Sequence, residues 1–118
     1  MVKIAIPIFQ NRVSPVLDSC RHIIVAAIEK DAEIDREQVF IGDIALNDRC
    51  RIFKKLGITV IICSGVSATF GKLLEQAKFE IVDGIAGDVQ DVLTAYLDGR
   101  LDHPDFYMPG FKVKDDRL

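Results

Sequence analysis

The hydrophobic residues change their spacing partway along the chain. Positions 2, 4, 6 and 8 are all Val or Ile and alternate with other residues, which is the period of a strand. From Leu46 onward, apolar residues recur every three or four positions, which is the period of a helix face. The pattern therefore predicts strands first, and alternating helices and strands afterwards.

The first part of the chain is expected to form three strands. Residues 2–8 make the first, and the polar segment 9–15 follows it as a candidate binding loop. Residues 23–28 are apolar throughout, as in a strand covered on both faces. Residues 34–41 carry several charges, as expected of an edge strand that must not pair with another molecule. These last two strands are expected to form a hairpin.

The second part is expected to contain three helices and two further strands. The first helix starts at an Asn-Asp cap, and the strand over 58–63 leads into the second helix. The strand over 79–82 and a glycine-rich turn precede the third helix, which Asp88 caps. With right-handed crossovers, these elements predict an α/β fold: a mixed five-stranded sheet with helices on both faces and the first strand near its centre.

Three loops of this predicted fold should meet at one edge of the sheet. They cover residues 9–15, 63–67 and 83–87, and each follows the carboxyl end of a parallel strand, where open α/β sheets bind their ligands. Residues 1–101 are expected to form one domain, and residues 102–118 an irregular tail.

Composition and charge narrow the classes of function. The chain has 118 residues, 49% of them hydrophobic, and a net charge of -3. Its Lys and Arg residues are scattered, so no footprint for a nucleic-acid backbone is expected. No apolar run is long enough to span a bilayer, and the start of the chain lacks the form of a secretory signal. Three widely spaced cysteines do not indicate a disulfide framework, and we expect a cytoplasmic protein with free thiols.

Two of the cysteines are candidate ligands. Cys63 ends an apolar run just before a helix, whose N-terminus could lower the thiol pKa and favour the thiolate that binds iron-sulfur clusters. Cys20 lies beside Arg21 and His22, a cationic neighbourhood that could also activate a thiol. The alternative for either is a small buried side chain, and that is our interpretation of Cys50, which falls on a helical apolar stripe.

Other groups have an ordinary structural explanation beside the functional one. Glycines in the last two loops could let the backbone approach an anion, or could simply form tight turns. Isolated carboxylates beside the loops suit capping better than catalysis, so no enzyme is predicted. The glycines are Gly65, Gly84 and Gly87, and the carboxylates are Asp18 and Asp83. In the tail, Asp102, His103 and Asp105 form a further candidate group for metal binding, although such a group can occur by chance in a polar segment.

Several motifs together resemble the dinitrogenase iron-molybdenum cofactor biosynthesis family. They are Lys-Ile-Ala-Ile-Pro at 3–7, Arg-Val-Ser at 12–14, Cys-Ser-Gly-Val-Ser at 63–67, Gly-Ile-Ala-Gly-Asp-Val at 84–89 and Ala-Tyr-Leu-Asp-Gly-Arg-Leu at 95–101. The resemblance implies a ribonuclease H-like three-layer α/β/α domain that binds or carries an iron-sulfur or iron-molybdenum cofactor precursor. Nitrogenase-associated members commonly have His-Phe-Gly where this chain has Val16, Leu17 and Asp18.

These observations lead to one hypothesis and one alternative. The hypothesis is a non-enzymatic carrier of an iron-sulfur-containing metallocofactor, with a possible protein partner in delivery and no nucleic-acid or membrane partner. The alternative is a metal-free regulatory or interaction module that binds a small anion or a protein through the same loops. The candidate metal ligands are Cys20, His22 and Cys63. The full candidate binding set is Asn11, Arg12, Ser14, Cys20, His22, Cys63, Gly65, Gly84 and Gly87.

Overall fold

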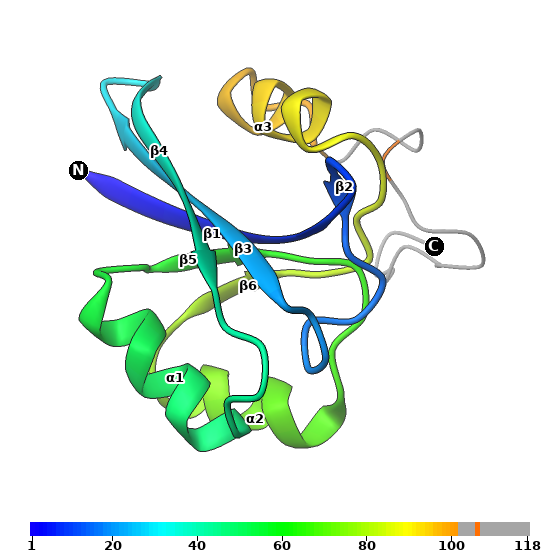
Figure 1. Ribbon diagram of the computed structural model, residues 1–118. Helices are drawn as coiled ribbons and strands as arrows, with labels where there is room; N and C mark the ends of the chain where they lie inside the picture. Colours follow the sequence, from blue (N-terminus) through cyan, green and yellow to red (C-terminus); the bar gives the residue numbers. More distant parts are fainter. Residues whose placement is uncertain (102–105, 107–118) are drawn as a thin grey trace, which may run out of the picture.

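The protein has one mixed β-sheet with helices on both faces (Figure 1). The computed structural model describes residues 1–101 and residue 106. The strands are β1 (Val2–Phe9), β2 (Arg12–Val13), β3 (His22–Glu29), β4 (Ala32–Phe40), β5 (Val60–Ile62) and β6 (Glu80–Val82); the helices are α1 (Leu46–Lys55), α2 (Ala68–Gln76) and α3 (Val89–Leu97). The three-layer α/β architecture expected from the sequence is confirmed.

The strand order along the sheet is β4-β3-β1-β5-β6. β1 is central, as predicted: it pairs antiparallel with β3 from Val2 opposite Ile28 to Ile8 opposite His22, and parallel with β5. β4 lies at the edge and exposes most of its side chains, which agrees with its charged sequence. Because β1 pairs with β5 and β5 with β6 in parallel, the carboxyl ends of these three strands lie at the same end of the sheet.

The alternation along β1 separates two hydrophobic cores. Ile4 and Ile6 point to the face covered by α3, where they pack with Val92 and Leu93. Ala5 points to the opposite face, where α1 and α2 contribute Phe53 and Phe70 to the second core (Figure 1). Because successive side chains of a strand point to opposite faces, one central strand can serve both cores.

Two details differ from the sequence-based expectation. The loop expected over residues 9–15 contains a sixth, two-residue strand, β2, which forms a hairpin with the end of β1. Gln10 and Asn11 make the turn with φ values of 52° and 65°, the left-handed conformation that such tight hairpin turns require. The predicted Asn-Asp cap of α1 is wrong: Ala45 is the N-cap, and no side chain caps this helix. The predicted Asp88 cap of α3 is confirmed.

Candidate functional site

The three predicted loops do converge, and hydrogen bonds between their backbones join them. The Val13 amide donates to Gly87 O at 2.9 Å, and the Val89 amide donates to Asn11 O at 2.8 Å. The Ile85 amide donates to Cys63 O at 3.0 Å, which joins the second loop to the third. Backbone amides and carbonyls of the three loops are therefore hydrogen-bonded to each other.

Gly65 lies where two of the loops approach each other closely. Its amide donates to Pro15 O at 2.9 Å, and its carbonyl accepts from the Leu17 amide at 2.8 Å. A Cβ at this position would lie 2.9 Å from Pro15 O, so glycine is required for the approach. Gly84 and Gly87 have φ values of 76° and 127°, which other residues rarely adopt. Turn conformation therefore accounts for Gly84 and Gly87, and the close approach of two loops accounts for Gly65.

The helix N-termini near these loops are capped by the protein's own side chains. The Ser67 hydroxyl accepts from the Phe70 amide at 3.0 Å, and the Asp18 carboxylate accepts from the Ser67 amide at 2.8 Å. At α3, the Asp88 carboxylate accepts from the Gln90 amide at 2.8 Å. Asp18 thus joins the segment before β3 to the start of α2, and these amides are not left open for an anion.

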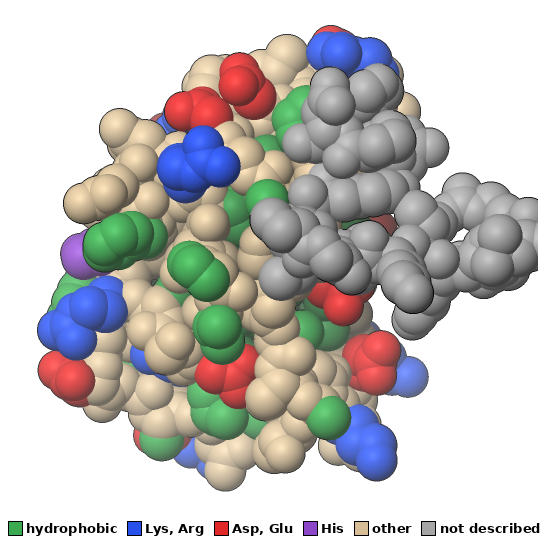
Figure 2. Space-filling view, turned by 90° about the vertical axis from the view of Figure 1, so that its right-hand side faces the viewer, with side chains coloured by type: hydrophobic (Ala, Val, Ile, Leu, Met, Phe, Trp, Pro, Cys, Tyr) green, Lys and Arg blue, Asp and Glu red, His purple; other side chains and the backbone are tan. Residues whose placement is uncertain are grey.

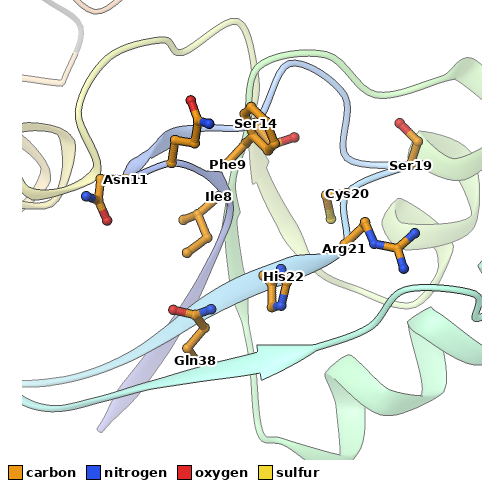
Figure 3. A pocket seen from close by; sticks show the side chains of 10 residues that line it. Ile8, Phe9, Asn11, Ser14, Ser19, Cys20, Arg21, His22 and Gln38 are labelled. Atoms are coloured by element: carbon orange, nitrogen blue, oxygen red, sulfur yellow. The ribbon is translucent and has the colours of Figure 1, made fainter.

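A pocket of about 580 Å³ lies beside this edge, between the β1–β2 turn, the segment before β3 and the exposed side of β4 (Figure 3). We call it the Cys20–His22 pocket. Figure 3 shows His22 and Gln38 on the neighbouring strands β3 and β4, with Ser19 and Cys20 on the segment that leads into β3. Its lining consists of Ile8, Phe9, Gln10, Asn11, Ser14, Ser19, Cys20, Arg21, His22 and Gln38. Four of the predicted binding residues, Asn11, Ser14, Cys20 and His22, therefore share one pocket.

Aromatic packing fixes the position of His22. Its imidazole packs edge-to-face against Phe40, with 5.2 Å between the ring centroids. The Arg21 guanidinium carbon lies 5.5 Å from the centroid of the same Phe40 ring. Phe40 is 53% exposed, so it packs against the imidazole without enclosing it.

Cys20 and Cys63, the two predicted metal ligands, are both buried, and burial changes the pKa of their thiols. Burial raises the pKa of the Cys20 thiol, although the neighbouring Arg49 guanidinium acts in the opposite direction. Burial, with a smaller contribution from Asp83, raises the pKa of Cys63 to about 12. The expectation that these thiols have a lowered pKa is therefore wrong. Removal from water outweighs the positive charge of Arg49 at Cys20, and at Cys63 burial and the neighbouring acidic groups act in the same direction. Cys50 packs in the second core, as expected.

The remaining predicted residues lie outside the pocket. Cys63 is fully buried at the end of β5 and belongs to the second core. Arg12 and Gly87 line a different pocket, of about 490 Å³, next to α3. Residues 1–101 and 106 contain no group of three or more His, Cys, Asp or Glu side chains that could hold a metal ion, so Cys20, His22 and Cys63 do not form a common ligand set. The Asp102, His103 and Asp105 group lies outside the described residues.

Sequence reasoning missed three residues of this region. Gln38 was assigned only to the edge strand; its pairing opposite Ile24 places it near β1 and the pocket. Ser19 carried no signal. Arg49 is buried behind Cys20, and the signal available for it was its position four residues before Phe53, on the inward side of the helix.

The face in Figure 2, which is the right-hand side of Figure 1, contains hydrophobic, acidic and basic side chains in a mixed arrangement. On the part formed by described residues, the basic side chains do not gather into one patch. None of the described helices is both long and apolar enough to cross a membrane.

An open mixed sheet covered by helices on both faces, with a pocket beside the end of its central strand, defines an α/β domain of the open-sheet class. More specifically, the chain belongs to the dinitrogenase iron-molybdenum cofactor family, whose family model matches residues 1–99. A comparison with curated proteins gave no match.

Several solved structures share the fold. PH0822 has a TM-score of 0.79 and 20% identity, and the match covers 87% of this chain and 96% of that one. A protein of Methanocaldococcus jannaschii provisionally named a dinitrogenase, MJ0327, has a TM-score of 0.70 and 21% identity over 84% of this chain and 90% of its own. A Thermotoga protein provisionally named NifB, TM1290, has a TM-score of 0.70 and 21% identity over 98% of this chain and 100% of its own.

Proposed function

We propose that this protein is a small, non-enzymatic cytoplasmic carrier that holds a preformed iron-sulfur-containing metallocofactor, or its precursor, as cargo in the Cys20–His22 pocket. The observation that carries the proposal is the presence of a thiol and an imidazole in one pocket, because these two side-chain types bind iron in protein-held clusters. The family of the chain, named for the iron-molybdenum cofactor, supports the same direction.

The chemistry of the donors fits a cargo better than a resident cluster. A resident iron-sulfur cluster is commonly held by about four protein ligands, whereas this pocket offers Cys20 and His22. Two donors suffice to attach a cluster that brings its own sulfides and ligands. They do not suffice to assemble one from free ions. We therefore assign delivery or storage, rather than catalysis, to this pocket.

Five of the lining residues have a role in this proposal. The Cys20 sulfur and a His22 ring nitrogen bind metal atoms of the cargo. The amide groups of Asn11 and Gln38 and the Ser14 hydroxyl donate hydrogen bonds to its sulfides or other acceptors. Since burial raises the pKa of Cys20, the thiol keeps its proton until a metal replaces it. Cys63 supports the pocket wall from the core and does not bind the cargo.

Anaerobic loading tests this function. Wild type and variants are incubated with a preformed cluster carrying small thiolate ligands and then desalted, and bound iron and visible absorbance are measured. Cys20→Ser and His22→Phe should lose the bound iron; His22→Phe keeps a ring against Phe40 but removes both nitrogens. Cys50→Ser is the matched control, because Cys50 is also a buried cysteine but does not line the pocket.

Equal iron retention in wild type, Cys20→Ser and His22→Phe would contradict ligation by these residues. Equal loss in the Cys50→Ser control would show that cysteine replacement acts through the fold. Circular dichroism and the melting temperature of each variant separate the two causes.

One observation favours the metal-free alternative. Both Cys20 and Cys63 have a raised pKa, so neither is poised as a thiolate, while Arg21 and the amide side chains in the pocket can bind an anion without any metal. In a thermal-shift screen, this alternative predicts stabilisation by small anions that persists in a Cys20→Ser variant.

A further inference from the structure

A buried arginine on α1 lies behind the Cys20–His22 pocket. Arg49 is 4% exposed. Its Nε donates to Ile44 O at 2.9 Å, and its Nη1 donates to Cys20 O at 2.8 Å and to Leu17 O at 3.3 Å. The same Nη1 lies 3.5 Å from the Cys20 sulfur. This guanidinium is therefore in direct contact with the thiol that lines the pocket.

Within residues 1–101 and 106, the structure gives Arg49 no counter-charge. The ion pairs of this part of the chain involve Arg36, Arg51 and Arg100. Asp18, two residues before Cys20, is bonded to Ser67 instead. Backbone carbonyls accept hydrogen bonds from Arg49 Nε and Nη1 but carry no net charge. Since a guanidinium stays protonated in proteins and buried charges are normally paired, a negative charge is missing here.

We infer that Arg49 makes the Cys20–His22 pocket selective for a net-anionic metal–sulfur cluster over a free divalent metal ion. The inference rests on the proposed function and names the class of cargo. Arg49 is a specificity-determining residue in this scheme and does not itself bind metal. The cargo supplies the negative charge that the buried guanidinium lacks.

The charge balance of the binding step gives the selectivity. With a cluster that carries small thiolate ligands, the Cys20 S–H bond breaks and a sulfur–metal bond forms. One thiolate leaves the cluster with the Cys20 proton, as a free thiol. This exchange leaves the net charge of the cluster unchanged. When the neutral His22 ring also binds, a second thiolate leaves and takes a proton from solvent, so a dianionic cluster keeps one negative charge, which lies next to Arg49. A divalent cation that displaces the same proton makes the pocket more positive, which Arg49 opposes.

Two probes separate charge selectivity from a packing role. The anionic probe is a [4Fe–4S] dianion with 2-mercaptoethanol ligands, and the cationic probe is Cd²⁺. Arg49→Met removes the charge, and Arg49→Lys keeps it. Arg51→Met is the matched control, because Arg51 lies on the same helix with its side chain 81% exposed and paired with Asp48.

Arg49→Met should lower the affinity for the cluster at least about tenfold, given the Coulomb energy of charges separated by a few ångström inside a protein. Its affinity for Cd²⁺ should stay the same or rise. Arg49→Lys and Arg51→Met should bind the cluster nearly as wild type does. Equal losses for both probes would assign Arg49 a packing role only, and an unchanged cluster affinity would also overturn the inference.

Arg49→Gln, which keeps hydrogen-bond donors for the carbonyls, takes the place of Arg49→Met if the latter does not fold. If the wild type takes up no cluster, the proposed function fails, and a second anion decides the inference separately. Tetrathiomolybdate is a dianion that needs no ligand exchange. Its stabilisation of wild type but not of Arg49→Gln in a thermal-shift assay would support charge selectivity. Equal stabilisation of both, or of neither, would refute it.

Discussion

Gly65→Ala should destabilise the protein, because two loops meet at this glycine with no space for a side chain. The added Cβ would lie 2.9 Å from the carbonyl oxygen of Pro15, whereas ordinary contacts begin near 3.4 Å. The obstacle is backbone and cannot rotate away. Gly65 does not have a positive φ, so the expected effect is steric.

The magnitude follows from the bonds that the shift would disturb. Moving the loops apart by several tenths of an ångström lengthens the bonds from the Gly65 amide to Pro15 O and from the Leu17 amide to Gly65 O. A hydrogen bond contributes about 0.5–1.5 kcal/mol net, and overpacking typically costs about 1–3 kcal/mol. We expect a loss of about 1–3 kcal/mol in the free energy of unfolding.

Urea denaturation followed by circular dichroism measures this loss. Gly71→Ala is the matched control with the opposite expected sign. Gly71 lies inside α2, where a Cβ meets only Val66 Cγ1 at 4.0 Å. Alanine there should stabilise by up to about 1 kcal/mol through helix propensity. A Gly65→Ala protein as stable as wild type would refute the claim that the close approach of the loops requires glycine.

Three further predictions concern the same edge of the sheet. Because burial raises the pKa of Cys63 from 9.0 to about 12, the folded state keeps a proton that the unfolded chain loses. This contribution to the free energy of unfolding is fully present below pH 9 and is lost as the pH rises toward 12, by at most about 1.4 kcal/mol per pH unit. In urea titrations above pH 9, Cys63→Ala should therefore lose less stability with rising pH than wild type does. Asp88→Ala should destabilise by about 1 kcal/mol, since its carboxylate accepts from the Gln90 and Asp91 amides; Asp88→Asn should restore most of this, and equal melting temperatures for all three proteins would contradict the cap. Val16→His, which places an imidazole where nitrogenase-associated relatives commonly have one, should leave cluster affinity unchanged, because Val16 does not line the Cys20–His22 pocket; an increase would mean that the cargo binds over Val16.

The sheet could be predicted because its signals are local. The parity of Ile4, Ala5 and Ile6 assigns side chains to two faces, and a strand that supplies two cores must lie inside the sheet. The charges of β4 predicted its edge position. The parallel orientation of β1, β5 and β6 followed from the alternation of strands and helices, whereas the pairing of β5 with both neighbours is a result of the structure.

The site could be predicted only in part. Local signals identified Asn11, Ser14, Cys20 and His22, but not that these residues share a pocket with Gln38, because that contact depends on the register of β3 against β4. The direction of the thiol pKa shifts was missed for a related reason. A nearby helix start or basic residue can be recognised in the sequence, whereas the burial that raises both pKa values results from packing between segments far apart in the chain.

A cargo site built on a histidine at position 16 would differ in location from the proposed site in the Cys20–His22 pocket. Val16 is 41% exposed and pairs with Gly65, so a histidine there would stand over the meeting point of two loops. Cys20 and His22 lie beyond that point, beside β4, with Arg49 buried behind them. The segment that connects the two positions is tied to Gly65 at one end and to Arg49 at the other. This chain, which has no histidine at position 16, therefore places a thiol, an imidazole and a buried positive charge together, and under the proposed function these favour an anionic cluster over a metal ion.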